Sequence, residues 1–293
     1  MGRAKEFLRA VLPPVVVSAA RHVRLTSERP VWEYVPEGWA RQREDPHLGW
    51  DAETVADAHR AIWKRWLNAV GGTGALGVDF WMYLHDAQIG AEFESNLPFA
   101  HNAVMTFGYV LARTAHARQS ISVLDWGSGV GQYHPLARAL LPEVEIDYHC
   151  RDVPVLTAVG RELLPEVAFY EDDSCFGRRY DLVFASSSLQ YVEDWKTALQ
   201  RLGGATRRYL LLTRTPTVAR NPSFVVLQRG RPYGFGTDVL EWFLNRDELL
   251  ECAAGAGLRL VREFVMLDST PASGAPEQAR YRGFLFEPAQ GGA

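Results

Sequence analysis

The chain has 293 residues, of which 47% are hydrophobic and 23% charged, as in a soluble globular protein with one large domain or one domain and a substantial extension. The formal net charge of −4 gives no electrostatic reason to expect nucleic-acid binding. Cys150, Cys175 and Cys252 are far apart and show no Cys-x-x-Cys spacing. The sequence therefore indicates neither a disulfide framework nor a zinc site, and a reducing, cytoplasmic setting is expected.

The N-terminal segment carries basic residues followed by an apolar run at 11–20 that two prolines interrupt. This run is too short to cross a bilayer, which takes about 20 apolar residues. We expect a helical arm packed on the domain, and a peripheral membrane contact is the less favoured alternative.

An aromatic-rich region comes next. Residues 31–50 predict irregular structure held by large aromatic side chains, and residues 51–70 predict a helix with Asp51 as N-cap. Six of the nine tryptophans lie within the first 81 residues, at positions 32, 39, 50, 63, 66 and 81. Such a region either lines a pocket for the substrate or forms the core of a small cap. We expect residues 1–100 to form this arm and cap, and residues 101–293 to form the cofactor domain.

The strongest signal follows a predicted helix at 102–116. Residues 121–124 read as a buried strand, and Gly127, Gly129 and Gly131 then occupy every second position before a helix at 134–141. Glycine tolerates positive φ and has no Cβ, so the backbone can turn sharply and lie against a ligand. A strand, a glycine loop and a helix open a nucleotide-type βαβ unit.

The spacing of the glycines separates two kinds of ligand. A dinucleotide fingerprint places its third glycine at position 132, which is Gln132 here. Asp125 also stands at the end of the strand, where a carboxylate would repel a pyrophosphate but suits a ligand with an ammonium group. An oxidoreductase that uses NAD or a nucleotide sugar on a similar fold is therefore the less favoured alternative.

The next two strands, at 144–150 and 167–170, also end in acids. Asp152 follows the first of them, where a carboxylate can accept hydrogen bonds from two ribose hydroxyls. Alternatively, it caps the helix that runs from 153 to about 164. The second strand leads into Glu171, Asp172 and Asp173, one of which contacts the ligand unless the three form a solvated acidic loop, and the sequence does not decide which acid that is.

The rest of the chain completes an α/β pattern. A strand at 180–185 leads to a serine-rich turn at 186–191 and to a helix with Asp194 as N-cap. After a strand at 209–213 come some 25 irregular residues with a short strand at 224–228, which we expect to act as an acceptor-binding lid. A helix at 245–254, with a capping-box-like start at Asn245, and strands at 258–267 and 280–286 follow. This order predicts a doubly wound sheet closed by an antiparallel hairpin.

The D-x-G-x-G-x-G pattern and the sequence Leu-Gln-Tyr after the fourth strand resemble class I S-adenosylmethionine (SAM) methyltransferases. The resemblance covers roughly residues 100–287 and implies a seven-stranded, mostly parallel sheet. It implies a SAM site made by Asp125, Gly127, Ser128, Gly129, Gly131, Asp152, Asp172, Asp173 and Gln190. More loosely, the whole chain resembles methyltransferases associated with bacterial surface-polysaccharide synthesis. The acceptor implied is a small molecule or a saccharide, methylated at O or N.

A general base is needed only where the acceptor is a hydroxyl that must lose its proton. The candidates are His101, His134 and Tyr191, and the sequence holds no metal-binding motif. Two further alternatives remain, which are another SAM-fold enzyme such as an aminopropyl transferase and a non-catalytic binding module. A non-catalytic module would normally have lost the glycines or the acids, and this chain has both.

Overall fold

The computed structural model describes residues 31–45, 47–73, 90–230 and 235–289. The predicted arm at 11–20 and Trp81 of the aromatic-rich region lie outside these residues. Seven strands form the main sheet, and their bounds are β2 Ser120–Trp126, β3 Glu145–Arg151, β4 Ala168–Tyr170, β5 Tyr180–Ser186, β6 Thr206–Val218, β9 Leu258–Thr270 and β10 Ala279–Pro288. The helices are α3 Ala40–Glu44, α4 Glu53–Gly71, α5 Gly90–Ala115, α6 Tyr133–Leu140, α7 Pro154–Leu163, α8 Trp195–Ala205 and α9 Arg246–Gly255.

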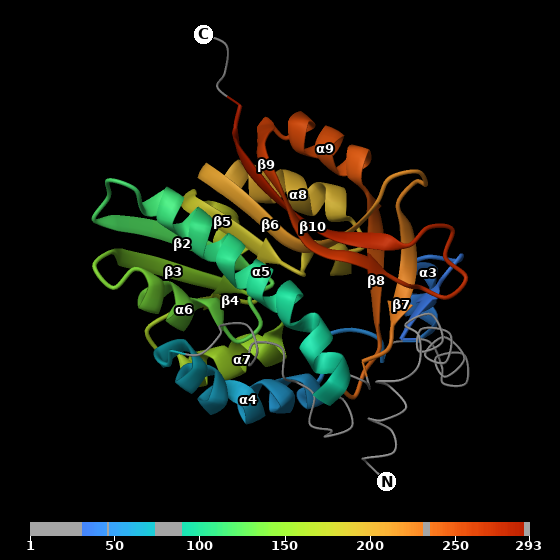
Figure 1. Ribbon diagram of the computed structural model, residues 1–293, viewed down its shortest axis with the longest axis horizontal. Helices are drawn as coiled ribbons and strands as arrows, with labels where there is room; N and C mark the ends of the chain where they lie inside the picture. The colour runs from blue at the N-terminus through green and yellow to red at the C-terminus, as the bar shows by residue number, and fades with distance from the viewer. Residues whose placement is uncertain (1–30, 46, 74–89, 231–234, 290–293) are drawn as a thin grey trace, which may run out of the picture.

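The main sheet confirms the predicted fold. Strands β4, β3, β2, β5 and β6 lie side by side in this order and are all parallel. Strand β10 pairs antiparallel with β6, and β9 pairs antiparallel with β10, which makes the predicted closing hairpin. Helices α4 to α7 cover one face of the sheet, and α8 and α9 cover the other (Figure 1). The carboxyl ends of the parallel strands therefore meet at one edge, where such folds bind ligands.

The predicted lid is largely a small sheet, which corrects the expectation of irregular structure. Strand β6 continues to Val218, and β7 Phe224–Gln228 and β8 Val239–Asn245 pair antiparallel. Strand β1 Trp32–Tyr34, from the region predicted to be irregular, adds to β7, and β8 joins the end of β6. The ten strands described thus form one sheet. The predicted boundary at residue 100 falls inside α5.

Two of the predicted helix caps are confirmed and two are not. Asp194 accepts a hydrogen bond from the Thr197 N–H, and Asn245 caps α9. Helix α4 begins after Ala52, however, and Asp51 instead accepts a hydrogen bond from the N–H of Val155 in α7. The N-cap of α7 is Val153, because Asp152 directs its carboxylate partly to the glycine loop.

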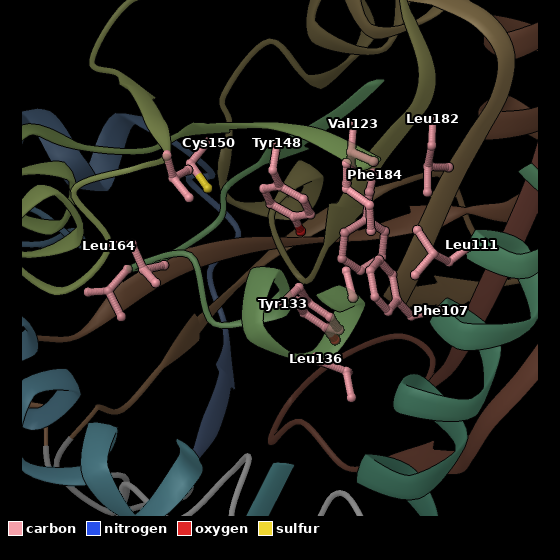
Figure 2. Close-up of a cluster of buried hydrophobic side chains, with 14 of the residues drawn as sticks. Phe107, Leu111, Val123, Tyr133, Leu136, Tyr148, Cys150, Leu164, Leu182 and Phe184 are labelled. Atoms are coloured by element: carbon pink, nitrogen blue, oxygen red, sulfur yellow. The ribbon is translucent and has the colours of Figure 1, made fainter. Parts of the chain in front are cut away.

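Buried aromatic rings support the region beneath the glycine loop (Figure 2). The ring centroids of Phe107, Tyr133 and Phe184 lie 4.6 to 4.8 Å apart, and they join α5, α6 and β5. Aromatic pairs at this separation add to the stabilisation from burial. Since Tyr133 is the first residue of α6, this packing holds the helix that follows the loop.

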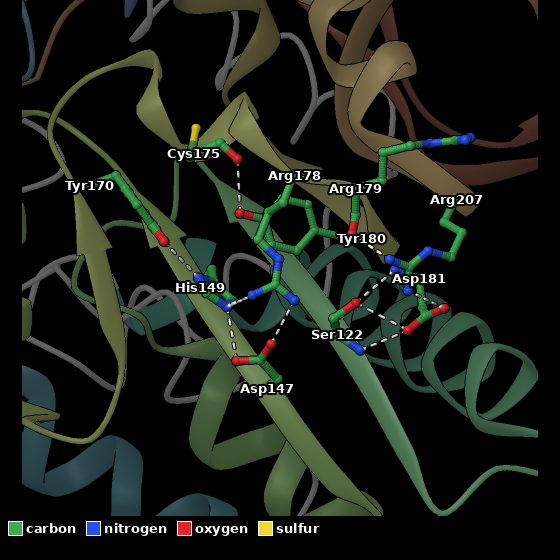
Figure 3. Close-up of polar contacts among 10 residues, drawn as sticks. All are labelled: Ser122, Asp147, His149, Tyr170, Cys175, Arg178, Arg179, Tyr180, Asp181 and Arg207. Carbon is green, nitrogen blue, oxygen red and sulfur yellow. Dashed lines mark hydrogen bonds and ion pairs between the residues drawn. The ribbon is translucent and has the colours of Figure 1, made fainter.

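Polar groups tie neighbouring strands together away from the glycine loop (Figure 3). The buried Asp181 at the start of β5 accepts hydrogen bonds from the backbone N–H and the hydroxyl of Ser122 in β2. Arg178 donates to Asp147 and contacts His149, both in β3. These contacts hold the register of β2, β3 and β5, and hence the alignment of the strand ends that form the site.

Candidate functional site

The glycine loop has the backbone conformation that its sequence predicts. Gly127, Gly129 and Gly131 have φ values of +72°, +60° and +85°, which L side chains rarely adopt. A Cβ at Gly127 would lie only 2.1 Å from the Cβ of Ser188, in the turn after β5. The N–H groups of Gly127 and Ser128 donate to the carbonyl of Arg151 at the end of β3. The loop is thus held between two strand ends.

Asp152 binds the loop directly. Its Oδ2 accepts a hydrogen bond from the Gly129 N–H at 2.6 Å, and its Oδ1 accepts from the Val153 N–H at 2.7 Å. Burial raises the pKa of Asp152 to about 6, although these two N–H groups favour the charged form. The structure therefore brings together the loop and the acid predicted to meet a ribose.

Asp125 lies at the end of β2 and is almost completely buried. The Tyr148 hydroxyl donates to its Oδ2 at 2.9 Å, and no hydrogen bond from the described residues reaches Oδ1. Burial raises the pKa of Asp125 to about 7, the contact with Tyr148 lowers it, and the nearby Asp152 raises it further. A cation arriving here would favour the ionised form of both acids.

Two backbone turns are linked by one side chain, and they lie just after β5 and inside β6. Ser187 and Arg214 have φ values of +52° and +54°, uncommon for residues other than glycine. The buried Gln190 amide joins these turns by donating to the Ser187 hydroxyl at 3.0 Å and to the Arg214 carbonyl at 3.2 Å. Its Oε1 is buried and has no hydrogen-bond partner among the described residues. Backbone strain of this kind is often kept at functional sites.

Arg214 brings a buried positive charge to the same edge of the sheet. Its guanidinium donates from Nε to the Ser186 hydroxyl at 2.9 Å and from Nη2 to the Ser186 carbonyl at 3.0 Å. The Tyr133 hydroxyl lies 3.2 Å from that Ser186 hydroxyl. The positive charge of Arg214 also lowers the pKa of Asp125, so opposite charges face each other near the loop. The sequence analysis missed Arg214, because nothing in its local pattern indicates burial.

The three acids after β4 point to different partners. Glu171 pairs with Arg161 of α7, and Asp173 pairs with Arg201 of α8. Asp172 caps the short 3₁₀ helix Asp173–Gly177, where its Oδ1 accepts from the Ser174 N–H at 3.0 Å. Contacts with Ser174 hold the pKa of Asp172 below its usual range.

Tyr191 lies in an aromatic cluster beside the small sheet. Its hydroxyl donates to the Gln228 Oε1 at 3.0 Å, and its ring meets the edge of Trp50 at a centroid distance of 5.0 Å. Trp50 also packs on Phe235 at 5.2 Å. Tyr191 ends the 3₁₀ helix Leu189–Tyr191, so this cluster adjoins the turns that Gln190 joins.

A carboxyl group that the sequence analysis missed is buried in the same cluster. Glu241 of β8 is 0% exposed, and its Oε1 accepts a hydrogen bond from the Trp32 indole at 2.5 Å. Its Oε2 has no hydrogen-bond partner among the described residues. Burial raises the pKa of Glu241 to about 8, although contacts with Trp32 and Tyr191 lower it. The signal available in the sequence was a single acid inside the apolar run 239–244.

The two predicted histidines lie apart from this cluster. His134 is buried on α6, where it meets Tyr148 at a ring distance of 5.3 Å and lies 3.8 Å from Glu166. It lines a cavity of about 590 Å³ with Leu67, Arg138 and the start of β3, and neither Tyr191 nor Asp152 lines that cavity. His101 is exposed and stands inside α5, not before it as predicted.

The described residues contain neither a cluster that would hold a metal ion nor a helix suited to a membrane crossing. Among them, no three or more His, Cys, Asp or Glu side chains gather in a way that would hold a metal ion. None of the helices within the described ranges combines the length and the apolar character that a membrane crossing requires.

No family model matches the sequence, and no curated protein matches it. Solved structures do resemble it in shape. The 1,6-didemethyltoxoflavin-N1-methyltransferase of Burkholderia thailandensis, solved with 1,6-didemethyltoxoflavin and S-adenosylhomocysteine, is 17% identical, with 64% of this chain and 78% of that chain covered and a TM-score of 0.42.

Two others are sugar-modifying enzymes. A SAM-bound amino pentose methyltransferase of Micromonospora echinaspora, involved in calicheamicin biosynthesis, is 14% identical, with 64% and 91% of the two chains covered and a TM-score of 0.44. A sugar N-methyltransferase from Streptoalloteichus sp. is 14% identical, with 63% and 86% covered and a TM-score of 0.43. At these values the likeness concerns the fold.

Proposed function

We propose that this protein is a SAM-dependent methyltransferase that acts on a small molecule or a saccharide at O or N. The observation that carries the proposal is the meeting of Asp125, the positive-φ glycine loop and Asp152 at one edge of the sheet. In this proposal Asp125 accepts from the ammonium group of the methionine portion. Asp152 accepts from the ribose hydroxyls, and Asp172 faces the adenine.

The charges around the loop favour SAM over NAD. Both carboxyl groups are buried and have raised pKa values, so a further negative charge from a pyrophosphate would be unfavourable there. A ligand with an ammonium and a sulfonium group instead offsets the repulsion between the two acids. Gln132 adds to the preference for SAM over NAD, because its side-chain oxygen, a hydrogen-bond acceptor, lies close to the loop. Gln132 Oε1 would be 2.7 Å from a Cβ placed on Gly129.

Bound SAM would supply a methyl group that already has a good leaving group. The protein then contributes mainly by positioning the acceptor, and holding two reactants together lowers the barrier substantially. We assign the binding of the methyl acceptor to Tyr191 and Glu241, because the buried Oε2 of Glu241 has no partner among the described residues and can hydrogen-bond a hydroxyl or amine of the acceptor. With a pKa of about 8, Glu241 is largely protonated at neutral pH and becomes able to take up a proton as the pH approaches 8. His101 and His134 have no role in this proposal.

The test is calorimetric titration of the purified protein with SAM, S-adenosylhomocysteine and NAD in parallel. Saturable binding of the first two without binding of NAD is the expected result. Binding of NAD alone would favour the oxidoreductase alternative and overturn the proposal. Absence of all binding by the folded protein would favour a non-catalytic module.

The acceptor assignment needs a separate test. Glu241→Gln keeps the size of the side chain and an oxygen that can accept from Trp32. We expect this variant to bind S-adenosylhomocysteine as the unmodified protein does. With an acceptor that supports turnover, it should lose the part of the pH profile that ionisation near pH 8 produces. An unchanged pH profile would remove Glu241 from the acceptor site.

A further inference from the structure

A second cavity opens at the far end of β6, away from the glycine loop. Its volume is about 820 Å³, within the range of small-molecule sites. It lies between the end of β6, the turn that joins β9 to β10, and the first residue of α9. The charged residues that line it are Arg220, Arg246, Arg280, Arg282, Glu263 and Glu277. Four guanidinium groups and two carboxylates therefore line it, and Arg246 also pairs with Asp247, which does not line the cavity, at 3.0 Å.

The first carboxylate, Glu277, is already engaged by the backbone. It accepts hydrogen bonds from the N–H groups of Ala219, Arg220 and Asn221 at 2.9 to 3.1 Å, and from the Asn221 side chain at 3.1 Å. Burial alone would raise its pKa, but these donors lower it to about 2. Glu277 thus holds the turn after β6 in place, and its nearest approach to the Arg220 guanidinium is 3.8 Å.

The second carboxylate, Glu263, serves two arginines. Arg246 donates to its Oε2 from Nε at 3.0 Å and from Nη2 at 2.9 Å. The Nε of Arg282 lies 3.9 Å from the other oxygen of Glu263. Arg246 and Arg282 are each partly buried, with side chains 38% and 24% exposed. The Glu263 carboxylate therefore holds both guanidinium groups in fixed positions.

Arg280 is the cation without a local counter-ion. It is exposed, and no hydrogen bond, ion pair or ring contact joins its guanidinium to another described residue. Arg220, which also lines the cavity, has only the 3.8 Å contact with Glu277. Arginine stays protonated in proteins, and its planar fork matches the geometry of phosphate oxygens.

We propose that this cavity binds the phosphate or diphosphate group of a small molecule, with Arg280 as its main contact and Arg220 as the second. Arg280 and Arg220 are the two guanidinium groups of the cavity that Glu263 does not hold, and together they suit a group with at least two negative charges. The volume exceeds what one phosphate needs, so a larger phosphorylated molecule also fits. This site is separate from the proposed SAM site, since none of its lining residues belongs to the glycine loop or to the Tyr191 cluster.

The test is calorimetric titration of the full chain with inorganic pyrophosphate, with and without S-adenosylhomocysteine. We expect saturable binding under both conditions, which weakens as the salt concentration rises because the charges are partly exposed. Arg280→Ala should reduce the affinity about 10-fold, the usual order for losing charged hydrogen bonds. Arg280→Lys should recover part of the affinity, since it keeps the charge without the fork.

Arg262→Ala is the matched control. Arg262 is an exposed arginine on the neighbouring strand β9, and it does not line the cavity. No ion pair or side-chain hydrogen bond joins its guanidinium to a described residue. Its replacement should leave pyrophosphate affinity unchanged. Absence of saturable binding by the folded protein, or equal losses in the two alanine variants, would overturn the proposal. A parallel titration with uridine 5′-diphosphate distinguishes a site for free pyrophosphate from a site for a diphosphate attached to a larger molecule. Tighter binding of either probe supports the site.

Discussion

The carboxylate of Asp152 accepts a hydrogen bond from the Gly129 N–H at 2.6 Å, so the end of β3 is fastened to the middle of the glycine loop. The two residues are 23 positions apart in the chain. The second oxygen of Asp152 is bonded to the Val153 N–H at 2.7 Å. One side chain therefore shapes the loop and stands where a ribose is expected. Replacing it should affect both.

Asp152→Asn should weaken S-adenosylhomocysteine binding by about 1–3 kcal/mol, the usual cost of losing one or two hydrogen bonds to a charged group. Calorimetric titration measures this change. Asp57→Asn, an exposed acid on α4, serves as the control and should leave the affinity unchanged. An unaltered affinity in Asp152→Asn, with the fold intact, would contradict the cofactor position proposed here.

Asp125→Asn tests which part of the ligand lies at the end of β2. The variant should bind S-adenosylhomocysteine about 10-fold more weakly, because an ammonium group loses a charged acceptor. It should bind 5′-methylthioadenosine, which has no ammonium group, as the unmodified protein does. Equal losses for the two ligands would mean that Asp125 acts through the shape of the loop and not through the ammonium group.

Gly127→Ala should destabilise the protein by about 3 kcal/mol, because a side chain at φ +72° is strained and its Cβ would lie 2.1 Å from that of Ser188. Denaturant unfolding measures the loss. Gly204→Ala in α8 is the control, since no atom lies within 4 Å of its added Cβ. Alanine should raise stability there by about 0.5 kcal/mol, because it favours helix more than glycine does. A mild effect at Gly127 would show that the Ser188 turn can move.

The raised pKa of Glu241 predicts that stability falls with rising pH. Its folded-state pKa of about 8 exceeds the ordinary 4.5, so the folded protein keeps a proton that the unfolded chain has released, and stability is lost between these values. Asp125 and Asp152 act in the same direction up to about pH 7 and 6. Burial lowers the pKa of His59 to about 4, so His59 acts in the opposite direction from about pH 4 to 6.5.

In the window from pH 7 to 8 Glu241 contributes most, because Asp125, with a pKa of about 7, is already half ionised where the window begins. We expect the free energy of unfolding to fall by about 1 kcal/mol across this window. Glu241→Gln should remove most of this dependence, because glutamine does not titrate. Urea unfolding at pH 7.0, 7.5 and 8.0 measures both proteins without ligand. Parallel curves for the two would show that another group titrates there.

Local patterns predicted much of the fold. The strand at Ile121, the glycine loop and the helix after it are close in sequence, and alternation, turn residues and caps such as Asn245 mark their limits. The resemblance to class I methyltransferases also implied one site that contains both Asp125 and Asp152. The structure brings them to the same edge, and their ligands remain predictions.

The small sheet and the polar groups behind it depended on contacts between distant segments. Trp32 pairs with Gln228 in β7 and donates to Glu241, about 200 residues away, and no local pattern carries such pairing. Arg214 and Ser187 take positive φ because Gln190 and the ends of two strands hold them there. The sequence by itself determined the loop and its acids, because strand, turn and helix signals are local. Only the tertiary structure decided that Glu241 and Arg214 are buried and which arginines gather at the second cavity, because burial and pairing arise when remote segments pack together.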